Sequence, residues 1–156
     1  MTNIVTSTPN SIKFVIHGEP ASKANSRIHV MWGDRPGSIK SHKARSFAAE
    51  FKRQCPKLEN PFTGDVEVEM TIWYASRRPD LDESLILDLL QFDKKTGTNY
   101  VIVNDRQIKR RITTWGLSPN NPRVELTVRQ HEVPAYLLEI EPKTKKKASR
   151  STKLAA

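Results

Sequence analysis

Apolar residues recur at every second position from Val66 to Tyr74, and Glu67 and Glu69 stand between them. A period of two places alternate side chains on opposite faces of a β-strand. The pattern therefore predicts a strand with one buried face and one polar face. Shorter alternating or β-branched runs predict further strands over residues 12–16, 100–103, 108–115 and 123–129.

Two other segments have the spacing of helices. Four apolar residues between Ala44 and Phe51 recur at positions i, i+3, i+4 and i+7, which is one buried stripe of an amphipathic helix. Ser41 can cap the first turn of this helix, and Pro56 cannot continue it. A shorter apolar run over residues 85–90 predicts a second helix, which Asp82 or Ser84 could cap.

Together these elements predict a single α+β domain in which a mixed β-sheet of about five strands packs with two helices. Glycine and proline place loops over residues 32–38, 94–99 and 118–122. A length of 156 residues suits one domain, expected over residues 1–141. A basic C-terminal tail, residues 142–156, is expected to be disordered because it has too few apolar residues to form a core.

Charge is distributed unevenly along the chain, which has a formal net charge of +9. Residues 1–57 carry ten basic and three acidic side chains, whereas residues 58–141 carry ten basic and fourteen acidic ones. Residues 142–156 carry six basic and no acidic side chains. Two basic segments thus flank a locally acidic one, and the basic segments favour a polyanionic partner.

Several function classes are excluded by missing residues. The single cysteine, Cys55, cannot form a disulfide framework or a cysteine zinc cluster within the chain, so a buried thiol is expected. The sequence contains no H-E-x-x-H, no G-x-S-x-G and no P-loop. No apolar run of 18 residues and no export signal is visible, so we expect a cytoplasmic protein without a membrane partner.

Three aspartates are candidates for catalysis. Asp80 and Asp82 directly follow the predicted strand over residues 66–74, and residues two apart on an extended chain point the same way. Asp105 lies in the connection between two later strands. Carboxylates from separate loops suit Mg²⁺, or alternatively Mn²⁺, which lowers the pKa of a bound water and neutralises charge on a phosphoryl group. Asp80, Asp82 and Asp105 are therefore the predicted metal ligands of a nuclease.

Other interpretations of these carboxylates stay open. An aspartate near a helix start is usually a cap, and an aspartate in a loop usually forms an Asx turn. Asp88, inside the second predicted helix, is interpreted as a surface or structural carboxylate, with a metal role as the less favoured option. A glycosidase could also use two carboxylates, but it would leave the basic segments unexplained.

Basic side chains gather in the N-terminal third of the chain. Some lie in the polar segment before residue 28, and others surround the start of the first predicted helix. On a helix surface such residues are most often simply solvated, but each contact with a phosphate releases counterions and favours binding. The residues predicted to bind DNA are Lys23, Arg27, Lys40, Lys43 and Arg45.

Three sequence blocks resemble the RusA-type Holliday-junction resolvases, small endonucleases of bacteria and their phages and prophages. The first runs from Gly18 to Arg27 and is followed by the Ser41-His42-Lys43-Ala44-Arg45 helix start. The second is Arg78-Pro79-Asp80-Leu81-Asp82, before a helix with a further aspartate, Asp88. The third is Asn104-Asp105-Arg106-Gln107-Ile108. The resemblance covers about residues 12–130 and thus leaves out the tail.

This resemblance implies that Asp80, Asp82 and Asp105 bind Mg²⁺ and that a homodimer nicks two strands of a four-way junction symmetrically. The sequence departs from the family in several places: Asn104 replaces the first of the family's paired aspartates, Asp88 lies closer to Asp82 than expected, and the loop before Asp105 is longer. Glu83 stands where the family has asparagine, and Ile86 stands where the family's helix carries a catalytic lysine. The missing charge would have to come from elsewhere, and the candidates are Lys23, Lys94 and Lys95.

Two rival hypotheses come from other function classes. A nucleic-acid-binding protein that grips junctions without cutting them would not need the missing lysine. A basic structural protein of a ribonucleoprotein would have a similar net charge and a similar tail. Cleavage of a labelled junction separates the enzyme from the first rival, and competition between RNA and junction DNA separates it from the second.

Overall fold

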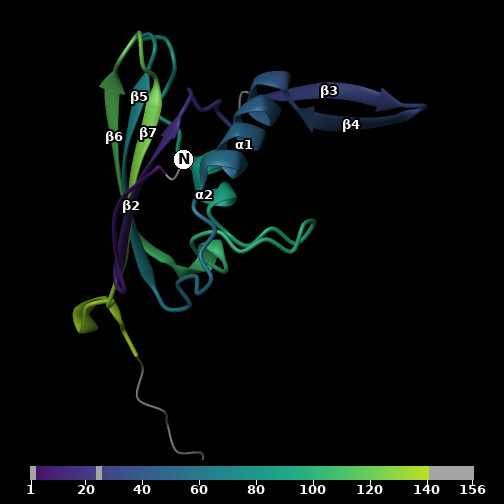
Figure 1. Cartoon of the computed structure of the whole chain (residues 1–156). Helices are drawn as coiled ribbons and strands as arrows, with labels where there is room; N and C mark the ends of the chain where they lie inside the picture. Colours follow the sequence, from purple (N-terminus) through teal and green to yellow (C-terminus); the bar gives the residue numbers. More distant parts are fainter. Residues whose placement is uncertain (1–2, 24–25, 141–156) are drawn as a thin grey trace, which may run out of the picture.

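The computed structural model describes residues 3–23 and 26–140, which form a five-stranded β-sheet, two α-helices and a separate β-hairpin (Figure 1). In the sheet the strands follow the order β1-β2-β7-β5-β6. All neighbours pair antiparallel except β5 and β6, which are parallel. Their bounds are Ile4–Thr8 for β1, Ser11–His17 for β2, Val66–Tyr74 for β5, Ile108–Leu117 for β6 and Arg123–Gln130 for β7.

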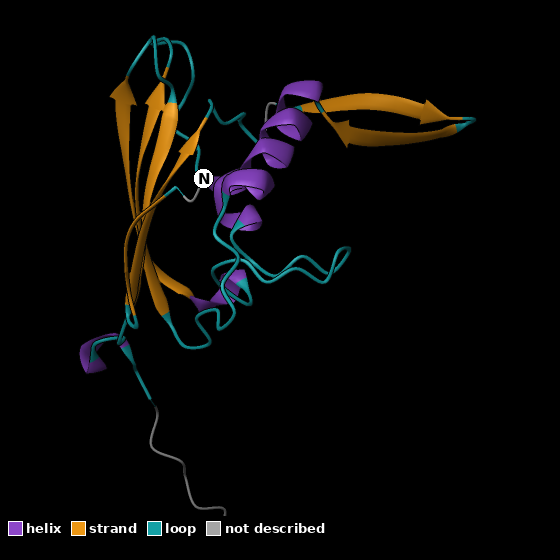
Figure 2. Ribbon diagram, viewed as in Figure 1, coloured by secondary structure: helices purple, strands orange, loops and turns teal. Residues whose placement is uncertain are grey.

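Both helices lie on the same side of the sheet (Figure 2). Helix α1 (His42–Gln54) is capped by Ser41, whose hydroxyl accepts a hydrogen bond from the Ala44 N–H at 3.2 Å. Helix α2 (Ser84–Leu89) is short and largely buried. The core lies between the sheet and the helices and includes Phe14, Phe51 and Leu126, which are fully buried. These observations confirm an α+β domain with a mixed sheet and two helices.

The opposite face of the sheet is polar, as the alternation in β5 predicts. Glu67 forms an ion pair with Arg110 at 3.2 Å and a longer one with Arg129 at 3.7 Å. Arg129 also pairs with Glu69 at 2.5 Å. On the same face the guanidinium of Arg123 stacks over the Trp73 ring, 4.6 Å from its centroid. Part of the acidity between residues 58 and 141 is therefore neutralised by arginines on this open face.

One predicted strand, over residues 100–103, and one predicted loop, over residues 32–38, were wrong. Residues 100–103 form no strand; Ile102 makes isolated bridges with Phe62 and Gln91. Tyr100, Val101 and Ile102 are instead buried in the core, where the N–H groups of Val101 and Ile102 both donate to the Leu90 carbonyl at 3.1 Å. β1 was missed because its exposed, threonine-rich sequence has no buried face.

Residues 32–38, predicted as a loop, belong to a β-hairpin of strands β3 (Arg27–Trp32) and β4 (Arg35–Lys40). The turn Gly33-Asp34 has two residues, and Gly33 has a φ of +62°, the sign that a type II′ turn requires at its first position. Pro36 is tolerated because it pairs with Met31, next to the turn-flanking pair Trp32 and Arg35. Hydrogen-bonded and non-hydrogen-bonded pairs alternate, so the nitrogen of Pro36 faces outward.

None of the helices in the described part of the chain is long and apolar enough to cross a membrane. The buried thiol is confirmed, since Cys55 is 3% exposed. The disorder expected for the basic tail, residues 142–156, concerns a segment outside the described residues.

Candidate functional site

The candidate acids lie in the connection between β5 and β6. Because these strands are parallel, the chain leaves β5 after Tyr74 at one end of the sheet and must return to the other end before Ile108. Helix α2 and the 3₁₀ turn η1 (Asp105–Gln107) lie on this crossover. The crossover therefore carries Asp80, Asp82, Asp88 and Asp105 within one continuous excursion of the chain.

Asp82 is held by hydrogen bonds to both carboxylate oxygens. Oδ2 accepts from the Ser22 hydroxyl at 2.9 Å and from the Lys23 N–H at 3.1 Å, and Oδ1 accepts from the Ser84 N–H at 2.9 Å. Burial opposes ionisation, but the bonds from Ser84, Ser22 and Lys23 outweigh it and lower the pKa of Asp82. Asp82 thus stays charged and ties the segment around residue 22 to the start of α2.

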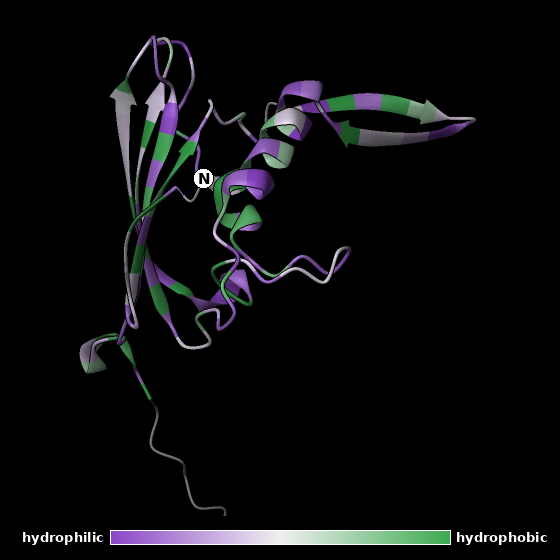
Figure 3. Ribbon diagram, viewed as in Figure 1, coloured by the Kyte–Doolittle hydropathy of each residue, from purple (hydrophilic) through white to green (hydrophobic). Residues whose placement is uncertain are grey.

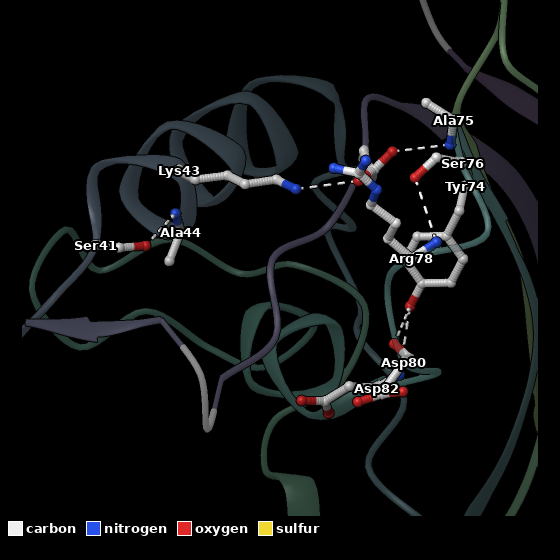
Figure 4. A network of polar contacts seen from close by, with 10 residues as sticks. Ser41, Lys43, Ala44, Tyr74, Ala75, Ser76, Arg78, Asp80 and Asp82 are labelled. Carbon is white, nitrogen blue, oxygen red and sulfur yellow. Dashed lines mark hydrogen bonds and ion pairs between the residues drawn. The ribbon is translucent and has the colours of Figure 1, made fainter.

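The backbones of Asp80 and Asp82 both contact the hydroxyl of Tyr74 (Figure 4). This hydroxyl donates to the Asp80 carbonyl at 3.1 Å and accepts from the Asp82 N–H at 3.3 Å. Burial raises the pKa of Tyr74, so the phenol remains a donor at neutral pH. The carboxylate of Asp80 forms no hydrogen bond or ion pair within residues 3–23 and 26–140 and lines a pocket of about 300 Å³ with Ser22 and Lys43.

Asp88 is one helical turn beyond Ser84, and its carboxylate Oδ2 lies 2.6 Å from Nζ of Lys23. About a third of the Asp88 side chain is exposed. Lys23 therefore contacts two acids, with its N–H on Asp82 and its ammonium on Asp88. Of the three lysines considered as substitutes for the family's helix lysine, Lys23 is ion-paired with an acid of α2, whereas Lys94 and Lys95 line a different pocket beside Asp88.

Asp105 opens η1, which is fixed by a capping box between Asn104 and Gln107. Gln107 also donates from Nε2 to the carbonyls of Phe62 and Gly64, at 2.7 and 2.8 Å. The turn is therefore anchored against the loop that precedes β5, and Asp105 itself stays exposed. The Gln107-Ile108 part of the third sequence block thus has a structural role.

One open pocket of about 360 Å³ brings Asp88 and Asp105 together. Ser84, at the start of α2, contributes to the same wall, and two cationic residues of β6 complete it. Arg111, one of these, also lies 3.5 Å from Glu83. The full lining is Ser84, Leu87, Asp88, Asp105, Ile108, Lys109 and Arg111.

The structure brings together part of the predicted acid set. Asp80 and Asp82 share the Tyr74 hydroxyl through backbone atoms and not through their carboxylates, whereas Asp105 lines one pocket with Asp88. Within residues 3–23 and 26–140, no group of three or more histidine, cysteine, aspartate or glutamate side chains is close enough to hold a metal ion. Sequence reasoning gave Asp88 only a minor role, considered Ser84 only as a helix cap, and did not single out Lys109 or Arg111. The i, i+4 spacing of Ser84 and Asp88 was the available signal.

The five predicted DNA-binding residues extend from the acidic crossover to the hairpin. Lys43 pairs with Glu19 at 3.0 Å, and the other oxygen of Glu19 accepts from the Ala75 N–H at 2.8 Å (Figure 4). Arg27, Lys40 and Arg45 have no acidic partner within 4 Å among the described residues. Arg27 and Lys40 face each other as a cross-strand pair at the base of the hairpin. Cationic groups thus continue from the crossover onto the hairpin.

No model of a known protein family matches the chain, and no curated protein sequence matches it.

Proposed function

We propose that the protein is a Mg²⁺-dependent endonuclease that hydrolyses phosphodiester bonds in branched DNA, as the resemblance to RusA-type resolvases implies. The observation that carries this proposal is the pocket in which Asp88 and Asp105 meet next to Lys109 and Arg111. It combines carboxylates for a metal with cations for a phosphate. Ser84, which shares the pocket, links it directly to the ionised Asp82.

The donor chemistry fits magnesium. Mg²⁺ prefers oxygen ligands and commonly uses only one or two protein carboxylates, with waters and substrate phosphates completing its shell. Asp88 and Asp105 would hold the ion, and Asp80 and Asp82, predicted as ligands from the sequence, would supply further negative charge from the adjacent turn. When bound, the ion would lower the pKa of a coordinated water and neutralise charge on the phosphate. Mn²⁺ has similar ligand preferences and is expected to substitute.

The remaining groups position the substrate. Lys109 and Arg111 would bind the phosphate beside the pocket, since cations near a phosphoryl oxygen stabilise its developing charge. Lys23 would supply the ammonium that the family places on the helix, because Ile86 at that position is fully buried and points into the core. Arg27, Lys40, Lys43 and Arg45 would bind the flanking backbone. A homodimer, which a four-way junction favours by its symmetry, and a cytoplasmic location complete the proposal.

The test uses the full chain with an end-labelled four-way junction in Mg²⁺, with EDTA as the metal-free control. We expect nicks that require the metal and that disappear in Asp105→Asn and Asp88→Asn. Junction binding in EDTA should be retained in both variants, because removing a negative charge reduces repulsion of phosphate. Glu132→Gln, which removes the same charge from an exposed position outside the crossover, should cut like the wild type.

A second candidate function is a junction-binding protein that does not cut. It is favoured because no three of the metal-ligating side chains among the described residues cluster together, and because an ion pair engages Asp88. Junction binding without nicks at every Mg²⁺ and Mn²⁺ concentration would decide for this candidate. Preference for RNA over junction DNA in competition would instead support a ribonucleoprotein component.

A further inference from the structure

The hairpin of β3 and β4, hereafter the arm, projects away from α1 and from the five-stranded sheet (Figure 1). Its two strands pair only with each other. A two-stranded ribbon is marginally stable in water unless something packs on it. We therefore expect a binding partner to stabilise the arm.

The two faces of the arm differ in chemistry, because alternate residues of a strand point to opposite sides. One face carries the basic cross-strand pair Arg27 and Lys40 at its base, then His29, and the apolar pair Met31 and Pro36 near the turn. The other face carries an apolar strip followed by Trp32 and its cross-strand partner Arg35 near the turn. Figure 3 shows this alternation of hydrophobic and hydrophilic residues along the ribbon. The apolar strip consists of Ile28, Val30 and Ile39.

On this second face the Trp32 ring packs on the backbone of the opposite strand. A Cβ atom added to Gly37 would lie only 2.7 Å from the Trp32 ring, so the ring covers the glycine at close range. Even so, Trp32 remains 63% exposed. One side of the indole thus rests on the backbone of β4, and the rest of its surface is open. The glycine gives the ring a support without filling the space beside it.

The charge of the arm indicates what this ring meets. Among residues 27–40, Arg27, Arg35 and Lys40 are cationic and only Asp34 is anionic. A second copy of the same positively charged arm would be repelled, whereas a polyanion would be attracted. Exposed aromatic rings in positively charged grooves bind nucleic acids by stacking on unpaired bases. Every base of a four-way junction is paired, but stacking is interrupted at its open centre, so base faces are exposed there, whereas a linear duplex exposes them only at its ends.

We propose that the arm is a branch-recognition element, in which Trp32 stacks on a base face exposed at the branch point while Arg35 binds the neighbouring phosphate. This inference rests on the proposed function for the identity of the nucleic acid, but it does not require cleavage. Arg27, Lys40 and the start of α1 would follow the backbone from that base toward the acidic crossover. The arm would thus select branched over linear DNA.

The experiment measures binding in EDTA, so that cleavage does not enter. The ligands are a four-way junction and a linear duplex of the same arm sequence. We expect Trp32→Ala to weaken junction binding about tenfold, since stacking of one base on an aromatic ring contributes on this order. Binding of the linear duplex should change by less than about twofold. Trp32→Phe, which keeps an aromatic face, should restore most of the junction affinity.

Matched variants separate stacking from stability of the arm. Trp32→Leu keeps an apolar side chain over Gly37 but has no aromatic face, so it should behave like Trp32→Ala. Ile28→Ala, which shortens another exposed apolar residue of the same face, should leave the preference for the junction unchanged. Arg35→Ala should weaken the binding of both ligands and reduce the salt dependence of that binding by about one phosphate contact.

Several results would overturn the inference. If Trp32→Ala lost affinity equally for the junction and the linear duplex, or if Trp32→Leu bound the junction like the wild type, the ring would not recognise the branch point. Conversion of a dimer to a monomer by Trp32→Ala in sedimentation would assign the face to a second copy of the chain. A Trp32-dependent junction preference without nicks in Mg²⁺ would sustain the arm's role while refuting the nuclease. Metal-dependent nicking with unchanged junction binding in Trp32→Leu would sustain the nuclease while refuting the arm's role.

Discussion

Asp82 is the residue for which the structure makes the sharpest quantitative prediction. Its carboxylate accepts three hydrogen bonds, from Ser22, the Lys23 N–H and the Ser84 N–H. Replacement by alanine removes the acceptor of all three bonds. We therefore expect Asp82→Ala to destabilise the fold even if the residue also takes part in binding a metal.

The magnitude follows from the kind of bond. A hydrogen bond to a charged group contributes about 1.5–3 kcal/mol, and buried donors that lose their acceptor are costly. Asp82 is only partly buried, so water replaces part of what is lost. For the three bonds together we expect a loss of about 2–4 kcal/mol in the free energy of unfolding at neutral pH. Asp80→Ala is the matched control and should change it by less than about 0.5 kcal/mol, since its side chain has no partner within the described residues.

Urea denaturation of the wild type and both variants between pH 7 and pH 3 measures the effect. Because the pKa of Asp82 is lowered in the folded state, its contribution is complete above the carboxyl's ordinary pKa. The contribution is lost as the pH falls through the folded-state value. The difference between wild type and Asp82→Ala should therefore shrink below about pH 4. A difference below about 0.5 kcal/mol at pH 7, or one that does not change with pH, would refute the reasoning.

Two further predictions concern buried positions. Burial raises the pKa of the Cys55 thiol from 9.0 to about 12, so the unfolded chain ionises first as the pH rises. Between neutral pH and pH 10 the wild type should lose about 1.4 kcal/mol more stability than a Cys55→Ala variant. Denaturation curves of both proteins at the two pH values measure this difference. Ile86→Lys, which places the family's lysine on α2, should cost several kcal/mol or prevent folding, because Ile86 is fully buried. Thermal denaturation measures the loss, and a stable variant that cuts junctions faster would contradict it.

The sequence was sufficient for the elements that have one buried face. Val66 to Tyr74 and the α1 stripe from Ala44 to Phe51 combine strong periodicity with a clear cap or stop, so local and tertiary preferences agree. The arm was missed because glycine and proline at residues 33–37 are also typical of loops. Only the pairing shows that Gly33 forms a two-residue turn and that Pro36 occupies a non-hydrogen-bonded position.

The candidate site could be predicted only in its parts. The three sequence blocks single out Asp80, Asp82 and Asp105, and the structure places all three on the crossover between β5 and β6. Which acids become neighbours depends on the path of that crossover, and sequence spacing does not contain this path. Asp88 therefore meets Asp105 in one pocket although 17 positions separate them, and Lys23, from the segment before the arm, pairs with Asp88.

The parallel pairing of β5 and β6 also bears on how the molecule assembles. An antiparallel neighbour can follow its partner through a tight turn, but a parallel one needs a long connection whose closure costs entropy before any pairing offsets it. Strand β6 stands at the edge of the sheet, so the rest of the sheet can form without it. We expect its docking to be a late and slow event in folding. Asp105 would then reach Asp88 only in the last step, so that partly folded chains lack the pocket.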